Sequence, residues 1–105
     1  FCGTYCASKY AVLALTRGLR AQLAPLGVDI VEAYPGLTDT DMTQGLDHLP
    51  KVSAADVAAA IIGAVINDLQ EVYIGADSEE MRDALAKDPE AAQTEADQYM
   101  PESLA

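Results

Sequence analysis

Apolar residues recur along this chain at the spacing of a helix in some stretches and in short β-rich runs in others. Leucine returns at every fourth position up to residue 23 before Pro25 breaks the pattern, which predicts a helix over residues 5–24. The run at residues 28–34 is rich in β-branched side chains and predicts a strand. Its mixed apolar and polar pattern suits a strand that is covered on both faces.

The second half of the chain alternates in the same way. Residues 36–52 are polar and contain turn-forming glycine and proline, which predicts a loop with one short helix near residues 41–47. Ser53 and Asp56 resemble a capping box ahead of an apolar stripe, which predicts a helix through residue 69. Three further predicted elements are a strand at residues 71–75, a helix capped by Asp77-Ser78-Glu79-Glu80 that ends at Lys87, and a last helix with Asp88 as its cap and Pro89 at its first position.

The predicted order is helix, strand, helix, strand, helix, helix, which is typical of an α/β architecture with a parallel sheet. Two parallel strands need neighbouring strands for their backbone groups and helices over both faces. We therefore expect a domain that continues upstream of Phe1. We assign residues 1–75 to this domain and residues 76–105 to an acidic helical tail.

Charge is unevenly distributed along the 105 residues. The chain has 17 acidic and 6 basic residues, a formal net charge of −11, and ten of the acidic residues lie in residues 71–105. A phosphate backbone requires a basic surface, so nucleic acid is excluded as a partner and the acidic end is interpreted as a solvated segment. No long uncharged apolar run occurs, which excludes a membrane-spanning helix, and neither a signal peptide nor an initial Met is found.

The cysteines and the histidine do not suggest a metal site. Cys2 and Cys6 are four residues apart, which is not the spacing of a redox CxxC pair, and His48 is the one histidine. These are too few ligands, so we expect no metal. Reduced, half-buried thiols in a cytoplasmic protein fit the two cysteines. His48 and the acidic turn at residues 39–41 are interpreted as loop and helix-capping features.

Tyr5 and Lys9 are the first candidates for chemistry. They are four residues apart near the start of the first predicted helix, so their side chains lie on one face. A fixed cation beside a phenol oxygen favours the phenolate and makes the tyrosine a better acid/base near neutral pH. Such a pair occurs in many sequences, so its neighbours are needed to interpret it.

The sequence around this pair resembles the second half of a short-chain dehydrogenase/reductase. The resemblance covers residues 3–42, where the following runs occur in the family's order and spacing: Thr4-Tyr5-Cys6-Ala7-Ser8-Lys9-Tyr10-Ala11, Gly27-Val28 and Pro35-Gly36-Leu37-Thr38-Asp39-Thr40-Asp41-Met42. It implies a Rossmann-like, doubly wound parallel sheet of which this chain is the C-terminal part. It also implies an NAD(P)-dependent oxidoreductase that acts on a small-molecule carbonyl compound or secondary alcohol.

The resemblance implies that Tyr5 is the catalytic acid/base, which gives its proton to the substrate oxygen as hydride arrives from the nicotinamide. Lys9 would hold the nicotinamide ribose hydroxyls and lower the pKa of Tyr5. The family's glycine-rich turn and catalytic Ser have no counterpart in this sequence, and Ser8 inside the motif cannot replace that Ser. We therefore expect the 105-residue chain to be inactive by itself.

Cofactor contacts are implied for the second part of the motif. Pro35 and Gly36 would form the turn beside the nicotinamide, outside the carboxyl end of a strand, where ligands of open α/β sheets bind. Thr38 would offer its backbone to the carboxamide, and Thr40 would contact the carboxamide or the phosphate end. Residues 41–52 would form a mobile substrate loop. The choice between NAD and NADP depends on upstream residues and stays open.

Two other functions stay open beside the reductase. The fragment could come from a nucleotide-sugar epimerase or dehydratase of the same fold, although the Pro35-Gly36 pair with Thr40 favours the simple reductases. It could also be a non-catalytic assembly module whose helices pair with another copy. For the whole protein, the exposed helical faces favour a homo-oligomer, either a dimer or a tetramer.

Overall fold

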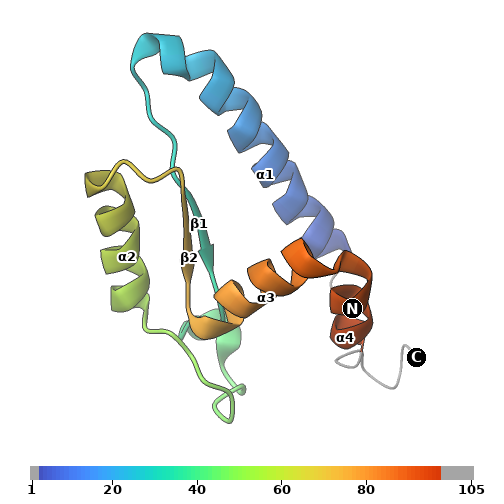
Figure 1. Cartoon of the computed structure of the whole chain (residues 1–105). Helices are drawn as coiled ribbons and strands as arrows, with labels where there is room; N and C mark the ends of the chain where they lie inside the picture. The colour runs from blue at the N-terminus through green and yellow to red at the C-terminus, as the bar shows by residue number, and fades with distance from the viewer. Residues whose placement is uncertain (1–2, 98–105) are drawn as a thin grey trace. The chain divides into compact units, whose positions relative to one another are not determined.

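A computed structural model describes residues 3–97 (Figure 1). Its elements, in chain order, are α1 (Gly3–Leu23), the 3-10 helix η1 (Ala24–Leu26), β1 (Glu32–Pro35), the 3-10 helix η2 (Asp41–Thr43), α2 (Ala54–Ile66), β2 (Glu71–Ile74), α3 (Ala76–Lys87) and α4 (Pro89–Asp97). The predicted alternation of helices and strands is confirmed. The chain divides into two compact units, Asp29–Glu80 and Phe1–Val28 with Met81–Ala105, and each is described by itself.

Local signals set the helix ends as predicted. Gly27 closes η1 with a φ of 72° and donates its N–H to the Ala24 carbonyl at 3.0 Å. The Ser53 hydroxyl oxygen accepts the Asp56 N–H at 3.0 Å and donates to the Asp56 carboxylate at 2.7 Å. Asp88 accepts the Ala91 N–H at 3.0 Å at the start of α4. These caps satisfy N–H and C=O groups that a helix end leaves without intrahelical partners.

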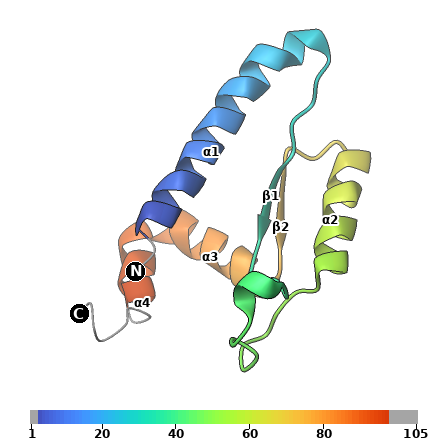
Figure 2. The ribbon, with the colours of Figure 1, turned by 180° about the vertical axis from the view of Figure 1, so that it is seen from behind.

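The two strands pair in parallel, with Glu32 opposite Glu71 and Tyr34 opposite Tyr73. Figures 1 and 2 show β1 and β2 side by side with α2 running along them, and α2 packs against β2. Side chains alternate across the sheet. One face therefore carries the glutamates and tyrosines just named, and the other carries the pairs Ala33–Val72 and Pro35–Ile74.

Four predicted boundaries are wrong. The strand predicted at residues 28–34 begins at Glu32, because β2 begins opposite that residue and offers no earlier pairing partner. The helix predicted through residue 69 ends at Ile66, since the Asn67 side chain donates to the Gly63 carbonyl at 2.7 Å and Asp68 adopts a positive φ of 53°. The helix predicted near residues 41–47 and the strand at 71–75 are also shorter, because Gly45 and Gly75 have φ values of 87° and 97°.

Few side chains in the described residues are buried. The buried apolar ones are Ala64 on α2, Ile74 on β2 and Ala92 on α4, and Glu32 is buried at 7% exposure. Exposed apolar side chains lie along α1 and α2, among them Tyr10, Val12, Leu15, Ile62, Val65 and Ile66. No helix within residues 3–97 has the length and apolar character needed to cross a membrane.

Tyr34 is the centre of a polar cluster on the sheet. Its ring stacks on Tyr73 with centroids 4.6 Å apart, and its hydroxyl donates to the Glu32 carboxylate at 3.1 Å. Burial, followed by this hydrogen bond, raises the pKa of Tyr34 from 10.0 to about 12. The neutral phenol is therefore the form that the folded sheet favours.

Candidate functional site

Tyr5 and Lys9 lie together on α1. The Lys9 Nζ lies 5.3 Å from the centroid of the Tyr5 ring, as expected for side chains four residues apart on a helix. Tyr5 is 48% exposed, so its phenol is open to a ligand. The Ser8 hydroxyl donates to the Tyr5 carbonyl at 2.7 Å and is engaged by its own helix. The structure thus pairs an accessible phenol with a cation on one helix face.

The two cysteines of the sequence lie beside this pair along the chain. Cys6 is a free thiol and is exposed, which corrects the expectation that it is half-buried. The reason is that the first turns of α1 bury none of their side chains in the described residues. Cys2 lies outside the described residues. Within residues 3–97, no group of three or more His, Cys, Asp or Glu residues could hold a metal ion.

Pro35 and Gly36 form the turn at the carboxyl end of β1. The Gly36 N–H donates to the Ile74 carbonyl at 2.8 Å, and the next N–H, of Leu37, donates to the Asp77 carboxylate at 2.8 Å. A methyl group built on Gly36 would overlap that carboxylate. Glycine leaves room for the Asp77 carboxylate, which occupies the space where another residue would place its Cβ.

A second contact fixes the same turn from the first turn of α3. The Ser78 hydroxyl donates to the Tyr34 carbonyl at 2.6 Å, one residue before Pro35. Asp77 and Ser78 were predicted only to cap α3. Their side chains instead reach a segment that is 40 and 44 residues away in sequence. The helix itself begins one residue earlier, at Ala76.

Thr38 and Thr40 lie in the loop that follows the turn. The Thr38 hydroxyl donates to the Gly36 carbonyl at 3.0 Å, and the Thr38 carbonyl accepts the Thr43 hydroxyl at 2.7 Å. The Thr40 N–H donates to the Thr43 hydroxyl oxygen at 3.1 Å. The Thr38 N–H has no hydrogen-bond partner among residues 3–97, so it is a donor that a ligand can use. Thr43 organises this loop, and nothing in the sequence distinguished it.

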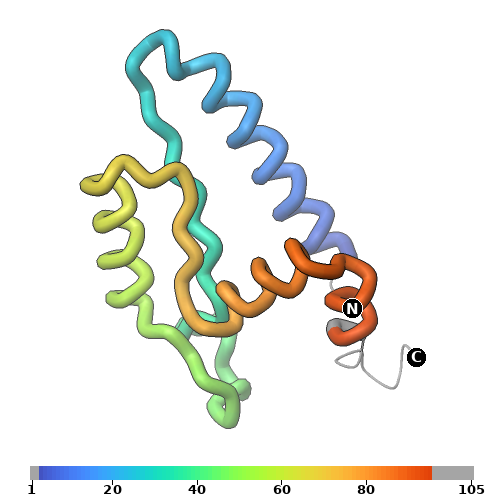
Figure 3. Tube along the Cα trace, in the orientation of Figure 1, coloured from blue at the N-terminus to red at the C-terminus, as the bar shows by residue number. Residues whose placement is uncertain are grey.

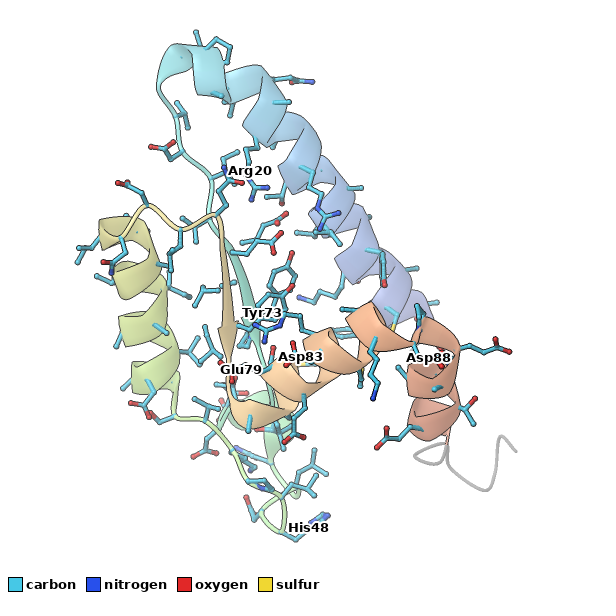
Figure 4. All side chains as sticks on the ribbon, viewed as in Figure 1. Arg20, His48, Tyr73, Glu79, Asp83 and Asp88 are labelled. Atoms are coloured by element: carbon cyan, nitrogen blue, oxygen red, sulfur yellow. The ribbon has the colours of Figure 1, made fainter. Side chains whose placement is uncertain are left out.

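Lys51 holds the far side of the loop. Its Nζ donates to the Thr43 carbonyl at 2.9 Å and to the Asp47 carboxylate at 2.8 Å, and lies 3.6 Å from the Asp39 carboxylate. Its side chain is 10% exposed. The hydrogen bond to Asp47 is the main reason that the pKa of Lys51 is raised. The loop that Figure 3 traces between β1 and α2 is therefore fastened internally, and His48 projects from its tip (Figure 4).

The predicted site residues fall into two sets, one in each compact unit. Tyr5 and Lys9 are brought together on α1. Pro35, Gly36, Thr38 and Thr40 are brought together in one turn and loop. Sequence reasoning missed Asp77, Ser78, Thr43 and Lys51, since each acts through a contact that depends on the folded backbone.

Comparison with known proteins identifies relatives for most of the chain. The sequence profile of the short chain dehydrogenase family matches residues 1–50. An uncharacterized oxidoreductase of Staphylococcus epidermidis is 38% identical over 63 residues, which are 58% of this chain and 27% of that protein. A 1-deoxy-11-beta-hydroxypentalenate dehydrogenase of Streptomyces exfoliatus is 40% identical over 81 residues, which are 70% of this chain and 29% of that protein.

A solved structure extends the similarity to the fold. A crystal structure is known of a short chain dehydrogenase from Burkholderia cenocepacia in complex with NADP. Its sequence is 36% identical to this chain, and the two structures superpose with a TM-score of 0.78 over 90% of this chain and 39% of that one. The predicted fold class, part of a Rossmann-like α/β domain, is thereby confirmed. The chain spans less than a third of the length of the two curated relatives named above.

Proposed function

Because this chain belongs to the short-chain dehydrogenase family, we propose that it is the part of an oxidoreductase that carries the catalytic acid/base and one side of the nicotinamide site. The substrate is a small-molecule carbonyl compound or secondary alcohol, and the cofactor is NAD or NADP. The placement of the Lys9 Nζ 5.3 Å from the Tyr5 ring carries the proposal.

Tyr5 transfers the proton of the reaction. In alcohol oxidation its phenolate accepts the hydroxyl proton as the C–H bond breaks, and in carbonyl reduction the phenol returns the proton to the oxygen. A bound nicotinamide dinucleotide accepts or supplies the hydride. The 48% exposure of Tyr5 leaves its ring open to a substrate.

Lys9 stabilises the charged form of Tyr5. Its Nζ lies 5.3 Å from the centroid of the Tyr5 ring, and a cation held close to a phenol oxygen favours the phenolate. The ammonium can also donate to ribose hydroxyls, since it has three N–H bonds.

The turn and loop after β1 supply groups that fit a nicotinamide carboxamide. Pro35 and Gly36 bring the backbone to the carboxyl end of the strand, and the Thr38 N–H is a donor without a protein partner in the described residues. A carboxamide oxygen accepts such a donor. Thr40 is exposed two residues further on and offers its hydroxyl to the carboxamide or to the phosphates. Residues 41–52 are the substrate loop, which Lys51 holds in the conformation described above.

The proposal is tested in the whole protein, because this chain covers 27–30% of the curated relatives it matches. Nicotinamide absorbance is followed with panels of ketones and secondary alcohols. Tyr5→Phe removes turnover, to a few per cent of the wild-type rate or less, and leaves dinucleotide binding nearly intact. Lys9→Ala weakens both. Tyr10→Phe, which alters a neighbouring tyrosine that is 68% exposed on the same helix, is the matched control and retains activity.

A Tyr5→Phe enzyme that kept more than a few per cent of activity would exclude Tyr5 as the acid/base. We also propose that the whole protein is a cytoplasmic homo-oligomer, a dimer or a tetramer. The exposed apolar residues of α1 and α2 support the association, and an exposed thiol at Cys6 suits a reducing compartment. Light scattering of the whole protein measures the association, and a monomer at micromolar concentration contradicts it.

A further inference from the structure

The turn at Pro35-Gly36 is held by the end of β2 and the first turn of α3, which are residues 74–78 and are called the β2–α3 segment below. Three hydrogen bonds connect the two: Gly36 N–H to the Ile74 carbonyl at 2.8 Å, Leu37 N–H to the Asp77 carboxylate at 2.8 Å, and the Ser78 hydroxyl to the Tyr34 carbonyl at 2.6 Å. Both segments belong to the same compact unit. Figures 1 and 2 show the start of α3 at the end of the strands where this turn lies.

The Asp77 carboxylate makes two different contacts with the turn. One oxygen accepts the Leu37 N–H, and the carboxylate as a whole fills the space in which a methyl group on Gly36 would lie. A hydrogen bond from a backbone N–H to an ionised carboxylate is stronger than one to a neutral acceptor. The side chain therefore fixes the position and the rotation of the Gly36–Leu37 peptide.

The consequence reaches the next residue along the chain. The N–H groups of Gly36 and Leu37 are both occupied by the β2–α3 segment, and the N–H of Thr38 is the first one left to a ligand among the described residues. The Thr38 N–H belongs to the next peptide plane, which the two dihedral angles of Leu37 join to the first. The Leu37 carbonyl in that second plane accepts the Val52 N–H at 2.8 Å, so Asp77 and Val52 hold Leu37 on both sides and together set the direction of the Thr38 N–H.

We propose that Asp77 is a positioning residue for the nicotinamide end of the cofactor. Asp77 holds the Leu37 N–H while Val52 holds the Leu37 carbonyl, and the two contacts together aim the Thr38 N–H at the carboxamide. Ser78 supports it by holding the Tyr34 carbonyl on the other side of the turn. This role rests on the function proposed above. It gives the first turn of α3 a part in cofactor binding, although no sequence motif marks that turn.

A purely structural role predicts something different. Asp77 and Glu79 are both acidic residues in the first turn of α3, where negative charge stabilises a helix. If helix stabilisation were the whole effect of Asp77, then Glu79→Gln would have the same consequences as Asp77→Asn. No hydrogen bond joins Glu79 to the turn, and Figure 4 shows it on the first turn of α3, so it is the matched control for charge and position.

The experiment compares two ligands in the whole protein. NADPH or NADH carries the carboxamide, whereas ADP-ribose lacks the nicotinamide ring. Dissociation constants of both are measured by titration for wild type, Asp77→Ala, Asp77→Asn and Glu79→Gln. We expect Asp77→Ala to weaken nicotinamide dinucleotide binding by about tenfold, the loss of roughly one good hydrogen bond, and to leave ADP-ribose binding within about twofold. Asp77→Asn, which keeps a neutral acceptor, gives an intermediate loss.

A second readout needs no cofactor. In protein labelled with ¹⁵N-leucine, the Leu37 amide shifts and exchanges faster in Asp77→Ala than in Glu79→Gln. Equal weakening of both ligands, or no weakening of either, overturns the positioning role while the proposed function stands. A wild-type protein that binds no nicotinamide dinucleotide overturns the proposed function and this inference with it. Should Asp77→Ala fail to fold, Asp77→Asn decides by the same ratio of the two dissociation constants.

Discussion

Gly36→Ala tests why the turn contains glycine. The φ of Gly36 is outside the left-handed region, so alanine can adopt the backbone, but its methyl group would overlap the Asp77 carboxylate. The carboxylate must then leave, which breaks its hydrogen bond to Leu37. A hydrogen bond to a charged group contributes about 1.5–3 kcal/mol to stability. Asp77 is exposed and solvent screens its charge, so we take about 1–2 kcal/mol for its bond to Leu37. We expect Gly36→Ala to lower the free energy of unfolding by that amount.

Once the carboxylate is removed, Gly36→Ala no longer lowers the free energy of unfolding. The three heavy atoms nearest to the new methyl group all belong to the Asp77 side chain, so an Asp77→Ala background removes these overlaps. Alanine then restricts the unfolded chain and is neutral or stabilising by up to about 1 kcal/mol. The coupling energy between the two positions is therefore about 2 kcal/mol, measured by urea unfolding of the four proteins of a double-mutant cycle.

Gly75→Ala is the control for this cycle. Gly75 has a φ of 97°, and its new methyl carbon would lie 2.8 Å from Val52 as well as from Asp77. It destabilises the protein in both backgrounds, because alanine does not tolerate that backbone conformation. If Gly36→Ala is as harmful without Asp77 as with it, then Gly36 is required for its conformation and the spatial explanation is refuted.

Two further predictions concern titratable groups. The raised pKa of Tyr34 means that its contribution to stability is present below pH 10 and is lost as the pH rises from 10 to about 12. After allowance for solvent screening, Tyr34→Phe reduces this alkaline loss of stability by about 1–2 kcal/mol. The loss is measured as the difference in the free energy of urea unfolding between about pH 9 and about pH 11.5. Tyr10→Phe is the control and leaves the loss unchanged. Lys51→Met removes the contacts to Thr43, Asp39 and Asp47, so hydrogen exchange in residues 39–47 becomes faster while Lys87→Met has no such effect. Unchanged exchange in Lys51→Met would show that the loop holds its shape without that ammonium.

Helix ends that are set by residues close to them in the sequence could be predicted from the sequence. Pro25 with Gly27, Ser53 with Asp56, and Asp88 with Pro89 act over a few residues, and the structure places helix ends at each of them. The Tyr5 and Lys9 pair was predictable for the same reason, because four residues along a helix bring two side chains to one face.

Features that depend on distant partners could not be predicted in this way. The start of β1 is set by its neighbour β2, and residues 28–31 look as β-like as those that follow. Asp77 looks like any acidic residue at a helix start, and its contact with Leu37 exists only when the strands are paired. Lys51 is one basic residue in a polar loop, and its role comes from three oxygen atoms that converge on its Nζ.

The parallel pairing of β1 and β2 has a consequence for biosynthesis. The ribosome completes Tyr5, Lys9 and the Pro35-Gly36 turn long before it reaches the segment that holds the turn, which lies 40 to 44 residues later. Until Ser78 is made, the turn lacks its anchors, and a connection of this length must close at an entropic cost before they form. A gene interrupted between these positions therefore encodes every residue of the motif without encoding the shape of its turn. In degraded or truncated genes of this family, an intact motif is no guide to an intact site.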